Sequence, residues 1–137
     1  MSNNFNNAAS AFILGLPAII LGMFQLRKNY PGEFKVFEEN LQAMQVAVNS
    51  YTLLQQTHQQ GSPIDPSKAA ATILALQKAI NDLHASLDTV LALGKYDEEK
   101  RQVFRAAIVD PFNKIIDENK ENINMLLAMG NNKGEQS

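Results

Sequence analysis

Residues 34–51, which read FKVFEENLQAMQVAVNSY, decide the fold class of this chain. Large apolar residues recur in this stretch at steps of three, four, three, four and three; they are Phe34, Phe37, Leu41, Met44, Val48 and Tyr51. Such spacing puts them on one face of an α-helix, at the a and d positions of a heptad. The same steps return downstream at Ile73, Leu76, Ile80, Leu83, Leu87 and Val90. The sequence therefore predicts two long amphipathic helices.

Helix start and stop signals set the bounds of these two helices. Tyr30-Pro31-Gly32 precedes the first helix and Gly61-Ser62-Pro63 follows it. Asp65-Pro66 supplies an N-cap and then a proline at the first helical position, where no backbone donor is needed. Gly94 is a natural C-terminal stop. The predicted ranges are about 31–59 and 66–93.

A third long helix is predicted over residues 97–129. Asp97-Glu98-Glu99 places acidic residues in its first turn, where the helix dipole favours them. Asp110-Pro111 falls inside the helix and predicts a kink or a break, because proline removes a backbone hydrogen bond. Gly130 ends the pattern, and we expect the tail 131–137 to be disordered.

These elements predict an all-α fold. Helices of this length joined by short loops must run in alternating directions. We expect an antiparallel bundle of three long amphipathic helices (about 31–59, 66–93 and 97–129), plus an N-terminal apolar helix at about 8–28. The chain of 137 residues then divides into the apolar helix, 1–29, the bundle, 30–130, and the tail, 131–137.

The first 26 residues carry no side-chain charge, and Ala8–Leu26 reads AASAFILGLPAIILGMFQL. As a helix this segment is about 28 Å long, close to the ~30 Å thickness of a hydrocarbon core. Arg27 and Lys28 follow it directly. Read as a membrane span, the segment places the basic flank and the bundle on the cytoplasmic side.

Two other interpretations of Ala8–Leu26 remain open. It fits a helix buried in the protein core or at a subunit contact, since a helix that is apolar all round needs burial of some kind. A cleaved signal peptide is disfavoured, because no basic residue precedes the apolar run. The residues predicted to face a membrane or a partner are Phe12, Ile13, Leu16, Pro17, Ile19, Ile20, Met23 and Phe24, with Arg27 and Lys28 as interfacial basic residues.

The sequence offers no pattern typical of catalysis. It has no cysteine, which excludes disulfides and thiolate metal sites. It contains no phosphate-binding glycine loop and no nucleophile elbow. His58 lies beside a loop, and His84 lies one position off an apolar face, so neither suggests a ligand. We predict no enzyme activity and no catalytic, cofactor or metal site, and the net charge of −2 disfavours nucleic acid as a partner.

The function expected from these features is that of a non-enzymatic helical interaction or structural protein. In the leading hypothesis, Ala8–Leu26 tethers it to a membrane while the bundle recruits or assembles protein partners. One alternative is a soluble cytoplasmic homo-oligomer with the apolar helix at its subunit contacts. Another is a secreted, membrane-active protein that inserts this helix into a target bilayer.

Overall fold

The computed structural model describes the backbone of residues 19–136 and the side chains of residues 19–129. The described chain is all-α, as predicted. Residues 19–29 are helical, and α2 (Pro31–Gln59) and α3 (Pro66–Leu93) follow with the predicted bounds. Helices α4 (Glu98–Ile108), α5 (Asp110–Glu118) and α6 (Lys120–Gln136) complete it.

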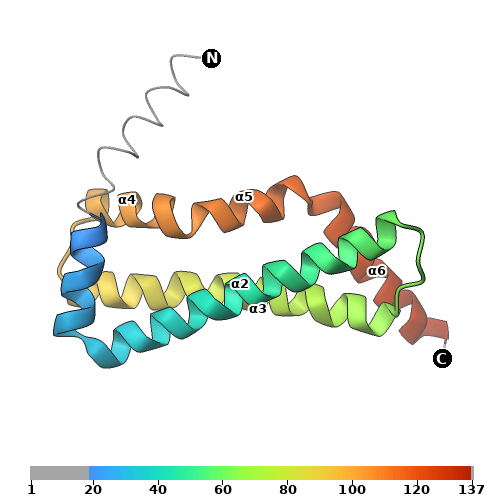
Figure 1. The fold of residues 1–137 in the computed structure, drawn as a ribbon, viewed down its shortest axis with the longest axis horizontal. Coiled ribbons are helices and arrows are strands. Elements are labelled where there is room, and N and C mark those ends of the chain that lie inside the picture. Colours follow the sequence, from blue (N-terminus) through green and yellow to red (C-terminus); the bar gives the residue numbers. More distant parts are fainter. Residues whose placement is uncertain (1–18, 137) are drawn as a thin grey trace, which may run out of the picture.

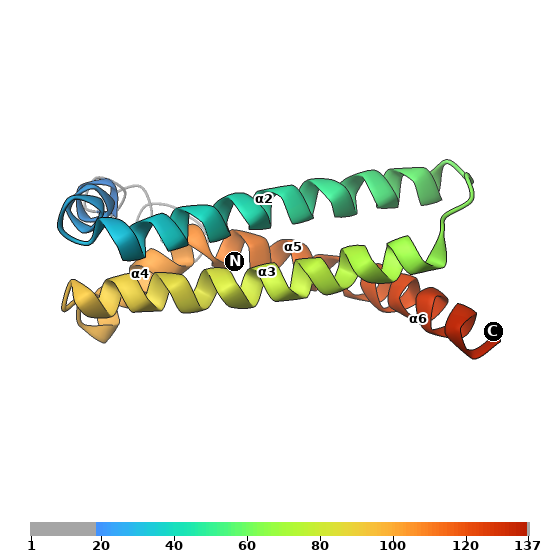
Figure 2. The same ribbon diagram turned by 90° about the horizontal axis from the view of Figure 1, so that it is seen from below.

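Helices α2 and α3 form an antiparallel pair that lies side by side over most of its length (Figures 1 and 2). Helices α4 and α5 run back along one face of this pair, and α6 continues from them to contact α3 (Figure 1). Helix 19–29 lies across one end of the bundle, beside the start of α2 and near α4 (Figures 1 and 2).

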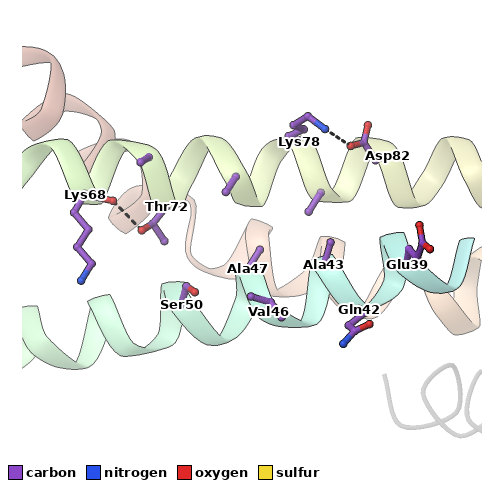
Figure 3. Close-up of a pocket in the computed structure, with 13 residues that line it drawn as sticks. Glu39, Gln42, Ala43, Val46, Ala47, Ser50, Lys68, Thr72, Lys78 and Asp82 are labelled. Carbon is purple, nitrogen blue, oxygen red and sulfur yellow. Dashed lines mark hydrogen bonds and ion pairs between the residues drawn. The ribbon is translucent and has the colours of Figure 1, made fainter. Parts of the chain in front are cut away.

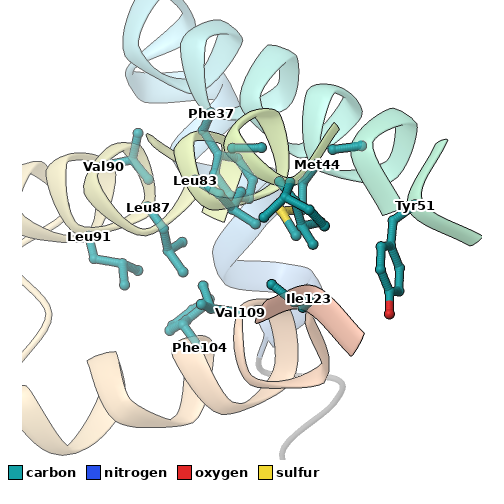
Figure 4. Packing of buried hydrophobic residues seen from close by; sticks show 14 of the residues in the cluster. Phe37, Met44, Tyr51, Leu83, Leu87, Val90, Leu91, Phe104, Val109 and Ile123 are labelled. Atoms are coloured by element: carbon teal, nitrogen blue, oxygen red, sulfur yellow. The ribbon is translucent and has the colours of Figure 1, made fainter. Parts of the chain in front are cut away.

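The core is built from the predicted apolar faces. Met44 on α2 and Ile73, Leu83, Leu87 and Val90 on α3 have no exposed surface. Phe104, Val109 and Ile123 from the returning helices close the core from the other side (Figure 4). Burying a side chain of this kind is worth about 1.5–3 kcal/mol, so the fold is held mainly by this cluster.

The predicted N-cap at Asp65 is confirmed, and Asp97, which was expected only as an acidic residue of the first turn, is an N-cap as well. Asp65 Oδ1 accepts a hydrogen bond of 2.9 Å from the Ser67 amide, and Asp97 Oδ1 accepts one of 2.9 Å from the Lys100 amide. Gly61 ends α2 with a positive φ of 78°, a conformation that costs glycine little. These local signals explain why the bounds of α2 and α3 could be predicted.

The third helix has the predicted break and a second one. The break before Pro111 is confirmed, and α5 begins at Asp110 with Val109 in the N-cap position. A second break, which was not predicted, lies at Asn119. The Asn119 side chain there donates to the Ile115 carbonyl oxygen (2.7 Å) and accepts from Gln55 Nε2 (3.1 Å). This local bonding competes with the regular helix and fixes the bend against α2.

The C-terminal prediction also needs correction. Helix α6 continues to Gln136, where the sequence predicted a helix end near 129 and a disordered tail over 131–137. A glycine inside a helix costs only about 1 kcal/mol, so Gly130 alone does not force an end.

Candidate functional site

Helix 19–29 has two different faces. Ile19 and Leu26 are buried against the bundle, whereas Ile20, Leu21 and Phe24 are 62%, 58% and 63% exposed. The exposed three lie at i, i+1 and i+4, on one side of the helix. We call them the outer face. Helix 19–29, which is apolar throughout in the sequence, therefore packs one face against the bundle and leaves the other face exposed.

Gly22 permits the docking of helix 19–29. A Cβ atom at Gly22 would lie 2.6 Å from Phe104 Cζ and 3.0 Å from the Tyr96 hydroxyl oxygen, so no larger residue fits without a shift. The rings of Tyr96 and Phe104 pack with their centroids 5.1 Å apart and tilted by 59°, a favourable aromatic arrangement. The helix thus rests on an aromatic pair at the start of α4.

Gly94 plays the same part at the end of α3. A Cβ atom there would lie 2.8 Å from both Leu26 Cδ2 and Tyr96 Cε2. Its φ of −74° is ordinary, and the left-handed position of the turn is taken instead by Lys95, with a φ of 59°. The amide of Tyr96 bonds to the carbonyl oxygen of Leu91, which closes a Schellman motif around that lysine. Gly94 provides room for Leu26 rather than backbone freedom.

The chain turns between helix 19–29 and α2 at Tyr30. Its φ of −132° and ψ of 63° are not helical, as expected for a residue before proline. The Tyr30 hydroxyl donates a hydrogen bond of 2.8 Å to the carbonyl oxygen of Leu93. This bond satisfies one of the carbonyl groups left free at the C-terminus of α3.

Arg27 and Lys28 are exposed, and they lie three and four positions after Phe24. They therefore extend the outer face by one turn, with positive charge following apolar side chains. This order is typical of helices at a bilayer surface, where basic side chains reach the headgroups. At the C-terminal end of a helix the same charges also favour the helix dipole.

The predicted membrane- or partner-facing residues fall into three groups. Phe12, Ile13, Leu16 and Pro17 lie outside the described residues. Ile19 is buried and Met23 partly buried, so these two face the bundle instead. Ile20 and Phe24 are exposed, and Leu21, which was not singled out, joins them. Among residues 19–136, no helix is long and apolar enough to cross a membrane.

A polar network links α3 to α4. Arg105 Nε contacts Asp88 Oδ1 at 3.0 Å, and its Nη1 contacts Glu98 Oε1 at 2.7 Å. His84 Nδ1 lies 3.3 Å from Asp88 Oδ2. The hydrogen bond from Arg105 lowers the pKa of Glu98, and the two acids raise the pKa of Arg105. Each of the four side chains, of Arg105, Asp88, Glu98 and His84, has a partner within the network. We therefore interpret the network as a structural link between α3 and α4.

Neither of the two histidines, His58 and His84, forms part of a reactive site among the described residues. His58 is exposed at the end of α2, and His84 contributes only its contact with Asp88. Within the part of the chain that the structure describes, no group of three or more His, Asp or Glu side chains could hold a metal ion.

Comparison with protein-family models, curated proteins and solved structures finds no match for this chain. Helical bundles carry many unrelated functions, so the fold does not indicate an activity. Any functional interpretation must rest on the surfaces of the molecule, above all on the outer face.

Proposed function

We propose that this chain is a non-enzymatic helical interaction protein, held at a lipid bilayer through its N-terminal apolar segment. The observation that carries the proposal is the outer face, because Ile20, Leu21 and Phe24 stand exposed directly after the uncharged residues 1–18. Arg27 and Lys28 then lie at the level of the lipid headgroups. The bundle is left free to bind protein partners.

The magnitude of apolar burial shows what the outer face contributes. Burying its exposed surface in lipid is worth about 3–5 kcal/mol, taking about 1.5–3 kcal/mol per fully buried side chain. A free energy of that size corresponds to a dissociation constant near 1 mM. The outer face alone would hold the protein only marginally, so the apolar residues before Ile19 must supply most of the attachment.

The docking of helix 19–29 shortens the segment available to the bilayer. Ile19 and Leu26 are in contact with the bundle, so lipid cannot surround this part of the helix while it stays docked. We therefore place the deeply inserted part before Ile19, with helix 19–29 lying at the bilayer surface on its outer face.

Extraction of membranes at alkaline pH tests this proposal. We expect the full chain to stay in the pellet after a carbonate wash, and its recovery in the supernatant would contradict a tether. With purified protein and lipid vesicles, Ile20→Ser with Phe24→Ser should weaken binding by about tenfold or more. A matched control, Leu74→Ser with Val103→Ser, removes exposed apolar side chains on α3 and α4 and should leave binding unchanged.

The same outer face favours a second candidate, a soluble homo-oligomer in which another subunit covers Ile20, Leu21 and Phe24. Removal of residues 1–18 together with Ile20→Ser and Phe24→Ser separates the two candidates. A tethered protein would lose its membrane attachment and keep the same oligomeric state. An oligomer joined through the apolar segment would dissociate or aggregate.

A further inference from the structure

One face of the α2–α3 pair lies away from α4 and α5 (Figure 2). This face carries a groove with a volume of about 670 Å³ (Figure 3). Small side chains form most of its surface: Ala43, Ala47 and Ser50 on α2, and Ala71, Thr72, Ala75 and Ala79 on α3. Val46 is the one large apolar residue lining it and is 58% exposed.

The groove continues past Ser50 into a second hollow of about 300 Å³. Ser50, Lys68 and Thr72 line both, and Leu53, which is well exposed, lies in the second. From Glu39 to Thr57 on α2 the combined groove is about 27 Å long. Helices of a bundle pack at separations of about 8–10 Å, so a groove with this small-residue surface admits further helices at close range.

The charges of the groove lie at its two ends. Glu39 stands at one end and Lys68 at the other (Figure 3). Lys78 and Asp82 on the rim form a pair of 2.6 Å and neutralise each other. The groove therefore has one net negative end and one net positive end.

These charges are placed symmetrically about the middle of the groove. Glu39 lies seven residues before Val46 on α2, and Lys68 lies seven residues before Ala75 on α3. Because the helices are antiparallel, and Asn40 Nδ2 bonds to the Asp82 carbonyl oxygen at 3.2 Å, Val46 and Ala75 lie opposite each other. Glu39 and Lys68 are then each about two turns from the centre, in opposite directions.

We propose that the groove binds the same groove of a second copy of this chain. A two-fold axis that crosses both helices near Val46 and Ala75 brings Lys68 of each copy to Glu39 of the other, and it does so twice. The alternative axis, parallel to the helices, would place Glu39 against the neutral Lys78–Asp82 pair of the other copy and would leave Lys68 facing a stretch of α2 that has no acidic residue. An isologous contact joins the same surface on both copies, so the charges of that surface must be self-complementary. Such charges determine the relative orientation of the two copies more than their affinity for each other.

The contact is of moderate size. Two helices of about 10 Å diameter over about 27 Å give a footprint smaller than the ~800 Å² per partner of a standard interface once edges are excluded. We therefore expect a dimer that dissociates on dilution, and the oligomeric state must be measured over a wide range of protein concentration. This inference uses a surface separate from the outer face and does not depend on membrane attachment.

Sedimentation equilibrium of the full chain in a mild non-ionic detergent tests the proposal. Glu39→Lys and Lys68→Glu should each raise the dimer dissociation constant about tenfold, since each removes both symmetric pairs and adds repulsion. The double variant Glu39→Lys with Lys68→Glu should restore the original constant, because both pairs form again with reversed sign. If the groove instead binds a different protein, the double variant would not restore the dissociation constant in this way.

Two further variants locate the contact. Val46→Glu should abolish the dimer, whereas Leu74→Glu, at a residue that is 56% exposed and does not line the groove, should not. Circular dichroism checks that both variants stay helical. A chain that is monomeric at every concentration would overturn the proposal and leave the groove to a different helix. A dimer that survives Val46→Glu, or a double charge variant as weak as the single ones, would overturn it as well.

Discussion

The hydroxyl of Tyr30 and the carbonyl oxygen of Leu93 are joined by a hydrogen bond of 2.8 Å, although 63 residues separate them in the sequence. The bond ties the turn before α2 to the end of α3. It closes the end of the bundle at which helix 19–29 is docked. Tyr30→Phe removes only the hydroxyl, so it should lower the free energy of unfolding by about 1 kcal/mol. Urea unfolding followed by circular dichroism measures this change.

Tyr51→Phe is the matched comparison, and it should give the opposite result. The Tyr51 hydroxyl is buried, and the Asn122 side chain near it does not form a well-aligned hydrogen bond with it. Burying such a group without a bond costs about 1–3 kcal/mol, so its removal should leave stability unchanged or raise it. A loss as large as that of Tyr30→Phe would show that the hydroxyl is bonded in solution.

Tyr51 also predicts a dependence of stability on alkaline pH. Burial raises its pKa above the ordinary value of 10.0, and the Asn122 side chain offsets this only in part. The folded protein then keeps the phenol protonated where the unfolded chain loses the proton. This contribution to stability is complete below pH 10 and is lost as pH rises above it. Unfolding free energies measured on both sides of pH 10 should fall more in the native chain than in Tyr51→Phe.

Gly22→Ala should loosen helix 19–29. The new Cβ atom would meet Phe104 at 2.6 Å, so the helix must shift away, at a cost of about 1–3 kcal/mol. Gly32→Ala is the control, because nothing lies within 4 Å of its Cβ position, and there the higher helix propensity of alanine should stabilise the protein by up to about 1 kcal/mol. Hydrogen exchange of residues 19–29 should rise in the first variant only.

Lys95→Gly should stabilise the protein by about 1 kcal/mol, since Lys95 holds the left-handed conformation that glycine adopts without strain. Gly94→Ala should destabilise it, because the methyl group would meet Leu26 and Tyr96. Thermal unfolding of the two variants compares the effect of steric room at Gly94 with the effect of backbone conformation at Lys95. Equal effects of the same sign would contradict the roles assigned to them.

Arg105→Lys should weaken the link between α3 and α4 only slightly. Lysine cannot reach Asp88 and Glu98 together in the way the guanidinium does, but exposed ion pairs are worth at most about 1 kcal/mol. Because Arg105 lowers the pKa of Glu98, the stability from this pair is present above the ordinary carboxyl value of 4.5 and is lost as pH falls below it. The difference between native and variant unfolding free energies should therefore shrink on acidification.

Much of the fold could be predicted from the sequence because its signals are local. The heptad spacing from Phe34 to Tyr51 and the caps at Asp65 and Asp97 each depend on a few neighbouring residues. The break at Asn119 was not predicted, because asparagine inside a helix is not by itself a stop signal, and one of its two hydrogen bonds is made with Gln55 on a distant helix.

From the sequence, the candidate site could be predicted only as an apolar segment, without its division into a docked face and an exposed face. Residues 19–26 are apolar on all sides, so periodicity cannot tell a docked face from an open one. The signal that would have separated them is Gly22, since a glycine inside a helix often marks a close approach. What it approaches, the rings of Tyr96 and Phe104, lies more than 70 residues further along the chain.

The contact between Leu26 and Gly94 makes helix 19–29 and the last turn of α3 mechanically dependent on each other. Fraying of residues 91–96 would remove the surface against which Leu26 packs, and undocking of Leu26 would leave Gly94 uncovered. Undocking of helix 19–29 would thus give a signal at the C-terminal turn of α3, which the helix contacts through Leu26 and Gly94. The amide of Tyr96, bonded to Leu91, is a ready reporter of such a signal.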